Sequence, residues 1–166
     1  MKRLVLGRGN TSAEIIIIGE APGASEDLIG KPFVGKSGKL LNKLLILSGI
    51  NLEDIYFCNV IKCRPPNNRK PTKEEVDIHK PWLFQQIKLI DPELIILTGS
   101  TAAKAVLGVD EPISKLRGSW IMKDGKEYRI IFHPAYLMRF SPNDDSNPYG
   151  LTLNDLKDVR KKLYDL

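Results

Sequence analysis

The segment Ile15-Ile16-Ile17-Ile18-Gly19-Glu20-Ala21-Pro22-Gly23 decides the fold class of this 166-residue chain. Four consecutive isoleucines predict a buried strand. The glycines and the proline that follow predict a turn at the carboxyl end of that strand, with an acidic side chain at its mouth. In α/β proteins ligands bind outside the carboxyl ends of the strands, so we expect the functional site to begin here.

Strand and helix patterns alternate along the rest of the chain. Runs rich in Ile, Leu, Val or aromatic residues predict strands at 14–19, 55–60, 93–98 and 128–132. Apolar residues that recur at every third or fourth position predict helices at about 37–48, 73–90, 100–107 and 152–165. This order predicts one α/β domain over residues 1–166, a three-layer αβα sandwich around a central, mainly parallel four-stranded sheet.

Composition excludes several classes of protein. No apolar run approaches the roughly 20 residues of a membrane span, and the first residues lack a secretory signal, so we expect an intracellular, cytoplasmic protein with no membrane partner. Two cysteines, Cys58 and Cys63, cannot make a disulfide framework, and their spacing lies outside the common zinc patterns. Protein partners cannot be read from the sequence, and a monomer is the default expectation.

The net charge of +5 is concentrated between Asn59 and Lys73. This segment holds five cations and no acid, and its prolines favour a stiff, extended backbone. A solvated charged loop is the ordinary alternative, but a rigid cationic loop after a strand end also suits a phosphate backbone. The candidate phosphate contacts are Lys62, Arg64, Arg69 and Lys70.

A second pattern indicates a different chemistry. The stretch Gly30-Lys31-Pro32-Phe33-Val34-Gly35-Lys36-Ser37 satisfies the phosphate-loop pattern G-x4-G-K-[ST] of nucleotide hydrolases. The first glycine of such a loop lies directly at a strand end, however, whereas Gly30 is well separated from Gly19. No later predicted strand ends in an Asp that could hold Mg²⁺. A P-loop NTPase is therefore a distant alternative.

Four segments together resemble the uracil-DNA glycosylase superfamily, most closely its family 4, the thermostable bacterial and archaeal type. They are residues 19–23, 30–35, 59–71 and 133–139, and they occur in the family's order over most of the chain. The resemblance implies a monofunctional uracil-DNA glycosylase of base excision repair, a DNA N-glycosylase whose partner is uracil-containing DNA. Such an enzyme flips deoxyuridine out of DNA, hydrolyses the N-glycosidic bond, releases uracil and leaves an abasic site.

The resemblance gives three side chains a role at the base. Asn59 offers a donor and an acceptor that can read uracil and reject cytosine, although without the family a strand-end turn would be its ordinary role. Phe33 resembles the aromatic platform on which the base stacks, although a lone Phe is more often a core residue. His133 is the candidate donor to uracil O2 as negative charge builds there.

The residue that handles the nucleophilic water is left open. Other branches of the superfamily carry an Asp at the place of Ala21. We expect Glu20 to orient the water or the sugar and Glu26 to shape the pocket, and both are candidate catalytic residues beside Asn59 and His133. The remaining substrate-binding candidates are Gly19, Ala21 and Gly23.

The motif at 133–139 contributes two further DNA-binding candidates. Leu137 is placed like the superfamily's apolar wedge, which fills the space that the flipped nucleotide leaves in the base stack. Arg139 adds a cation to the same segment.

The sequence departs from family 4 at its iron–sulfur cluster. Members bind a 4Fe-4S cluster through an N-terminal C-x2-C pair, the cysteine of the K-C-R-P-P motif, and a fourth cysteine about sixteen residues later. Cys63 matches the third ligand, His79 stands at the fourth position, and the first pair has no counterpart. We therefore expect no cluster and no metal.

Other functions stay open beside the glycosylase. A catalytically impaired relative would bind DNA without releasing a base. A glycosylase of shifted specificity would act on another deaminated base such as hypoxanthine. The P-loop NTPase would hydrolyse nucleotide with Mg²⁺ and depend on Lys36.

Overall fold

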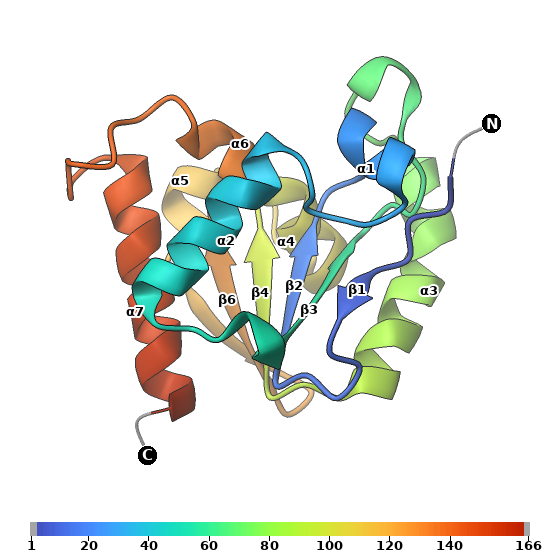
Figure 1. Ribbon diagram of the computed structural model, residues 1–166. Coiled ribbons are helices and arrows are strands. Elements are labelled where there is room, and N and C mark those ends of the chain that lie inside the picture. Colours follow the sequence, from blue (N-terminus) through green and yellow to red (C-terminus); the bar gives the residue numbers. More distant parts are fainter. Residues whose placement is uncertain (1–2, 165–166) are drawn as a thin grey trace.

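The computed structural model describes residues 3–164 as a six-stranded sheet with helices on both faces (Figure 1). The sheet has the order β1-β3-β2-β4-β6-β5. The strands are β1 (Arg8–Gly9), β2 (Ile15–Gly19), β3 (Ile55–Asn59), β4 (Leu94–Thr98), β5 (Trp120–Lys123) and β6 (Lys126–Ile131). The four inner strands are parallel, whereas β1 and β5 are antiparallel edge strands. The α/β sandwich and its parallel interior are confirmed, but the predicted sheet lacked both edges.

The four long helices were all predicted. They are α2 (Lys36–Ser48), α3 (Lys73–Ile90), α4 (Ser100–Leu107) and α7 (Pro148–Tyr164). The last begins four residues earlier than the predicted 152, at a proline whose fixed φ suits a first helical turn, and its predicted end at 165 lies outside the described residues. Within residues 3–164, no helix is both long and apolar enough to cross a bilayer.

Several short elements were not predicted. They are the helices α1 (Ala24–Ile29), α5 (Ile113–Leu116) and α6 (Pro134–Leu137) and the 3-10 turns η1 (Leu52–Asp54) and η2 (Pro66–Asn68). Three of these, α1, η2 and α6, lie in segments that follow β2, β3 and β6, where the functional motifs were located.

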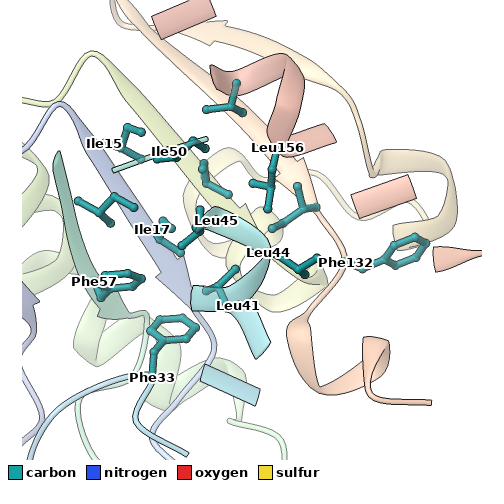
Figure 2. Close-up of a cluster of buried hydrophobic side chains, with 14 of the residues drawn as sticks. Ile15, Ile17, Phe33, Leu41, Leu44, Leu45, Ile50, Phe57, Phe132 and Leu156 are labelled. Atoms are coloured by element: carbon teal, nitrogen blue, oxygen red, sulfur yellow. The ribbon is translucent and has the colours of Figure 1, made fainter. Parts of the chain in front are cut away.

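The isoleucine run of β2 contributes to two separate cores. Successive side chains of a strand point to opposite faces, so Ile15 and Ile17 enter one cluster while Ile16 and Ile18 enter the other. The first cluster lies between the sheet and helices α2 and α7, as Figure 2 shows for Leu41, Leu44, Leu45 and Leu156. The second contains apolar side chains of α3 and α4. The sheet is thus covered on both faces, which explains why every residue of the central strands β2 and β4 is buried.

The edge strands lack the runs of apolar residues that predicted the inner strands. β1 has two residues, one of them glycine, and is too short for a pattern. β5 is joined to β6 by Asp124 and Gly125, whose φ angles of 51° and 78° make a turn of the kind that joins hairpin strands. This Asp-Gly pair is the signal that could have predicted the hairpin.

A buried ionic network fixes α7 to the sheet. Arg129 of β6 donates to Asp155 at 3.2 Å and to Asp158 at 2.9 Å, both on α7. Arg117 pairs with the same Asp155 carboxylate. The side chains of Arg129 and Asp155 are each 3% exposed, so the two charges stabilise each other in a site that water hardly reaches.

Candidate active site

A cavity of about 280 Å³ lies where β2, β3 and β6 end. It is lined by all four candidate catalytic residues, Glu20, Glu26, Asn59 and His133. Three substrate-binding candidates, Ala21, Gly23 and Phe33, line it as well, together with Arg69. The chain therefore brings together segments that are more than a hundred residues apart in sequence, because parallel strands end at one edge of the sheet.

Gly19 allows the base-reading amide and the aromatic ring to approach each other. Gly19 is paired with Asn59 across β2 and β3, so both strands end at the same level. A Cβ atom on Gly19 would lie 2.5 Å from Asn59 Oδ1 and 2.7 Å from Phe33 Cζ, closer than real Cβ contacts. The two functional side chains thus occupy the space that any other residue at position 19 would need.

Phe33 combines the two roles considered for it. Its ring lines the cavity and also belongs to the first core cluster, where it packs against Phe57 with ring centroids 5.7 Å apart (Figure 2). Its φ of 56° lies in the left-handed region, which costs a non-glycine residue on the order of 1–3 kcal/mol. Contacts with other residues must therefore stabilise the left-handed backbone conformation of Phe33.

Lys62 lies beneath the site rather than on the surface. Its side chain is 0% exposed, and Nζ donates to the main-chain carbonyl of Asn59 at 2.6 Å and to Gln86 Oε1 at 2.5 Å. Burial lowers the pKa of this ammonium group. The prediction that Lys62 contacts DNA is wrong, because both acceptors hold the ammonium group inside the protein.

His133 presents a defined ring tautomer. Its Nδ1 accepts the backbone N–H of Ala135 at 3.1 Å, so the proton of the neutral ring is on Nε2. Burial lowers the pKa of His133, and the nearby Glu20 carboxylate opposes this shift. Near neutral pH the ring is therefore a neutral hydrogen-bond donor in the wall of the cavity.

Glu20 is held by a residue that sequence reasoning missed. The Thr101 hydroxyl, in the first turn of α4, donates to Glu20 Oε2 at 2.5 Å. Thr101 follows the end of β4 closely, as Glu20 follows that of β2, so its place after a parallel strand was the signal that could have revealed it. This hydrogen bond fixes the direction of a carboxylate that lines the cavity.

Glu26 braces the backbone around the cavity. Its Oε1 accepts the N–H of Gly23 at 3.0 Å, and its Oε2 accepts those of Val34 at 3.0 Å and Gly35 at 2.6 Å. Both carboxylate oxygens are thus engaged by main chain, which fits the expected pocket-shaping role and leaves little capacity to activate water.

The same contacts contradict the phosphate-loop alternative. In a phosphate loop, backbone N–H groups of this kind bind the nucleotide, whereas here Glu26 already accepts those of Val34 and Gly35. Gly30 does not follow a strand: it caps helix α1 with a φ of 85°. The geometry of a Walker loop is absent from residues 30–37.

The basic segment after β3 forms part of the cavity wall. Arg64 Nε donates to Asn68 Oδ1 at 2.7 Å, and Asn68 lines the cavity. Arg69 also lines it and pairs with Glu75 at 2.6 Å, which lowers the pKa of that carboxyl to about 2. Lys70 is exposed. Arg64, Arg69 and Lys70 therefore lie in a loop around the cavity, as a phosphate-binding role requires.

Helix α6 does not expose the residue predicted as a wedge. Leu137 is 1% exposed and belongs to the first core cluster, so the predicted insertion of Leu137 into the base stack is wrong for this structure. Residues three apart share a helix face, and Pro134, three residues earlier, is buried as well. Ala135 lines the cavity, and Met138, three residues later and 52% exposed, lies on the same side.

Arg139, the last DNA-binding candidate, is exposed beyond α6. Its guanidinium carbon lies 5.8 Å from the centre of the Tyr136 ring. This places a cation next to Met138 on the exposed part of the same segment.

The residues related to a cluster do not form a ligand set. Cys63 is partly buried, whereas Cys58 is fully buried in the second core cluster, and burial raises the pKa of Cys58 to about 11. His79 Nδ1 accepts the backbone N–H of Lys62 at 2.9 Å. Among the residues from 3 to 164, no three His, Cys, Asp or Glu side chains are grouped so that they could hold a metal ion.

Comparison with known proteins identifies close relatives. The profile of the family described as "Uracil DNA glycosylase superfamily" matches residues 6–157. A Type-4 uracil-DNA glycosylase of Thermotoga maritima is 46% identical over 145 residues, which cover 85% of this chain and 74% of that protein. Proteins of the same name from Archaeoglobus fulgidus and Saccharolobus solfataricus are 43% and 44% identical. Each alignment covers 81% of this chain, and 71% and 65% of the two relatives respectively.

Proposed function

This chain belongs to the uracil-DNA glycosylase superfamily, and from this premise we propose that it is a monofunctional DNA N-glycosylase of base excision repair that removes uracil. The observation that carries the proposal is the meeting of Asn59, Phe33 and His133 in one cavity. The amide reads the edge of uracil, the ring stacks on its face, and the imidazole donates to O2.

The reaction breaks the bond between the sugar C1′ and uracil N1. The electron pair of that bond leaves with uracil, and negative charge spreads to O2, where a hydrogen bond from His133 Nε2 stabilises it. Water attacks C1′, its oxygen becomes the sugar hydroxyl, and its proton is released. Glu20, oriented by Thr101, is the acceptor that positions this water or stabilises the cationic sugar.

Access to the bond requires that the nucleotide leave the duplex, which costs about a few kcal/mol. The exposed cations Arg69, Lys70 and Arg139 and the partly buried Arg64 lie in the segments after β3 and β6 and would contact phosphates. Since Leu137 is in the core, Met138 is the apolar side chain that would fill the vacated base position.

The enzyme works without an iron–sulfur cluster in this proposal. The support is that His79, at the fourth ligand position, already accepts the Lys62 N–H, while Cys58 is buried in the second core cluster. No step of the reaction requires a metal. Purified protein should therefore contain no iron and show no visible absorbance from a cluster, and a coloured, iron-containing preparation would contradict this point. A monomer inside the cell completes the proposal.

Incubation with an end-labelled single-stranded oligonucleotide that contains one uracil, without Mg²⁺, tests the function. Hot alkali should then cleave the uracil strand at the abasic site, and neither a strand with cytosine in its place nor a reaction without alkali should be cleaved. A catalytically impaired relative would bind the oligonucleotide and leave it alkali-stable. A strand with hypoxanthine in place of uracil tests the alternative of shifted specificity. Asn59→Ala is the matched inactive control.

A further inference from the structure

The Arg8 guanidinium forms hydrogen bonds with the turn that carries Phe33. Its Nε donates to the carbonyl of Pro32 at 2.7 Å, and its Nη2 donates to the carbonyl of Phe33 at 3.1 Å. The two donors of one planar guanidinium therefore fix two successive peptide groups, a geometry that the single ammonium of a lysine does not reproduce.

The sheet register sets the position of Arg8. In the β1–β3 pairing Arg8 lies opposite Phe57, and its guanidinium carbon lies 4.1 Å from the centre of the Phe57 ring. The Phe57 ring in turn packs against that of Phe33. Among residues 3–164 no carboxylate is paired with Arg8, so main-chain carbonyls and an aromatic face are its partners.

The opposite end of the turn is held as well. Glu26 accepts the N–H groups of Val34 and Gly35, directly after Phe33. Gly38 of α2 lies so close that a side chain there would overlap the Phe33 carbonyl. The left-handed conformation of Phe33 is thus fixed by an arginine on the carbonyls and by a glutamate on the amides that follow.

We propose that Arg8 is a positioning residue of the active site, which holds the Phe33 ring at the angle and depth that the flipped base requires. The proposal deepens the glycosylase function and rests on it. Arg8 does not contact the substrate in this arrangement: it acts through the backbone of Phe33 and through the ring of Phe57.

The central variant is Arg8→Met, which keeps an unbranched stem over Phe57 and removes the donors. A misplaced platform should lower kcat/KM for the uracil oligonucleotide by on the order of 100-fold. Arg8→Lys, which keeps the charge, should recover only part of this loss. Arg3→Met is the matched control, because Arg3 is also an N-terminal arginine that donates to a main-chain carbonyl, that of Ile29, away from the cavity. Its activity should equal that of the unmodified protein.

A double-mutant cycle with Phe33→Ala decides whether Arg8 acts through the ring. If it does, Arg8→Met should lower kcat/KM strongly in the unmodified protein and hardly further in Phe33→Ala, because the ring is already gone. Equal losses in both backgrounds would overturn the proposal, as would an unchanged rate in Arg8→Met. If Arg8→Met does not fold, the same cycle with Arg8→Lys gives the answer.

Binding of free uracil, measured by calorimetry, separates this proposal from the proposed function. The unmodified protein should bind uracil more tightly than Arg8→Met, whether or not it cleaves the oligonucleotide. Binding without base release in the unmodified protein would reject the glycosylase and leave the role of Arg8 measurable. Base release in the unmodified protein together with equal uracil binding by both proteins would reject the role of Arg8 alone.

Discussion

Gly19 and Asn59 end neighbouring strands so close together that a methyl group on Gly19 would lie 2.5 Å from Asn59 Oδ1. Gly19→Ala should therefore displace the Asn59 amide, and the ring of Phe33 with it. We expect a loss of uracil excision on the order of 100-fold, measured in single-turnover reactions. Gly23→Ala should lower the activity less, because the added atom would meet only Glu26 Oε1, at 2.9 Å. Equal activity of Gly19→Ala and the unmodified protein would contradict the geometry of the site.

Variants of Met138 and Leu137 should separate the contact of the α6 segment with DNA from its packing in the core. Met138→Ala should slow uracil removal from double-stranded DNA several-fold and leave single-stranded DNA within about twofold, since only a duplex has a stack to fill. Leu137→Ala should instead lower the free energy of unfolding by about 2–5 kcal/mol, because it leaves a cavity in the core. Denaturant titrations and paired activity assays measure both. Were Leu137→Ala stable and selectively impaired on duplex DNA, Leu137 would be the wedge after all.

The two histidines should make the protein less stable in mild acid. Burial lowers the pKa of both His79 and His133 below the ordinary 6.5. The unfolded chain then takes up these protons first as the pH falls, so stability is full above about pH 6.5 and declines below it. The melting temperature should be lower at about pH 5.5 than at about pH 7.5. The double variant His79→Asn, His133→Asn should weaken this dependence, and an unchanged slope would refute the assignment.

Asp155 should be the most costly carboxylate to remove from α7. Asp155→Ala leaves Arg129 buried without its buried carboxylate partner. Such a change lowers the free energy of unfolding by about 3–5 kcal/mol. Asp158→Ala is the control, because Asp158 contacts the same arginine but is 55% exposed, and we expect a loss of about 1 kcal/mol or less. Urea unfolding of the two variants measures the difference. Similar losses of unfolding free energy in the two variants would show that the burial of a carboxylate does not determine its contribution to stability.

The basic loop should bind DNA without regard to sequence. The double variant Arg69→Ala, Lys70→Ala should weaken binding to all oligonucleotides alike and reduce the slope of log K against log salt by about one for each phosphate that is no longer neutralised. Binding titrations at several salt concentrations give this slope. Lys73→Ala, whose ammonium pairs with Asp77 on α3, is the matched control for the removal of a positive charge. If the unmodified protein, the double variant and Lys73→Ala all gave the same slope, Arg69 and Lys70 would not contact phosphates.

The sequence predicted the parts of the molecule that depend on strand order. Glu20, Asn59 and His133 each lie at the end of a predicted parallel strand or directly after it, and such strand ends meet at one edge of a sheet. This reasoning needs only the position of a residue in its element, so it located most of the cavity correctly.

Side-chain direction was harder to predict than strand order. Lys62 was expected at the surface because it belongs to a basic run, but Gln86, twenty-four residues later, supplies one of the acceptors that make its burial possible. Leu137 was placed from its motif, but a single turn of helix directs it into the core. Arg8 lies in a two-residue strand that leaves no pattern in the sequence. Each of these depends on partners that are distant in the chain.

The antiparallel edge strands have a consequence for how the protein behaves at high concentration. Within residues 3–164 both borders of the sheet are short, with two residues in β1 and four in β5. A second molecule would find few unpaired backbone groups there on which to add a strand, and short edges of this kind protect natural sheets from aggregation. The fully buried strands β2 and β4 lie inside the sheet, so their backbone groups are already paired with neighbouring strands and are not open to a second molecule.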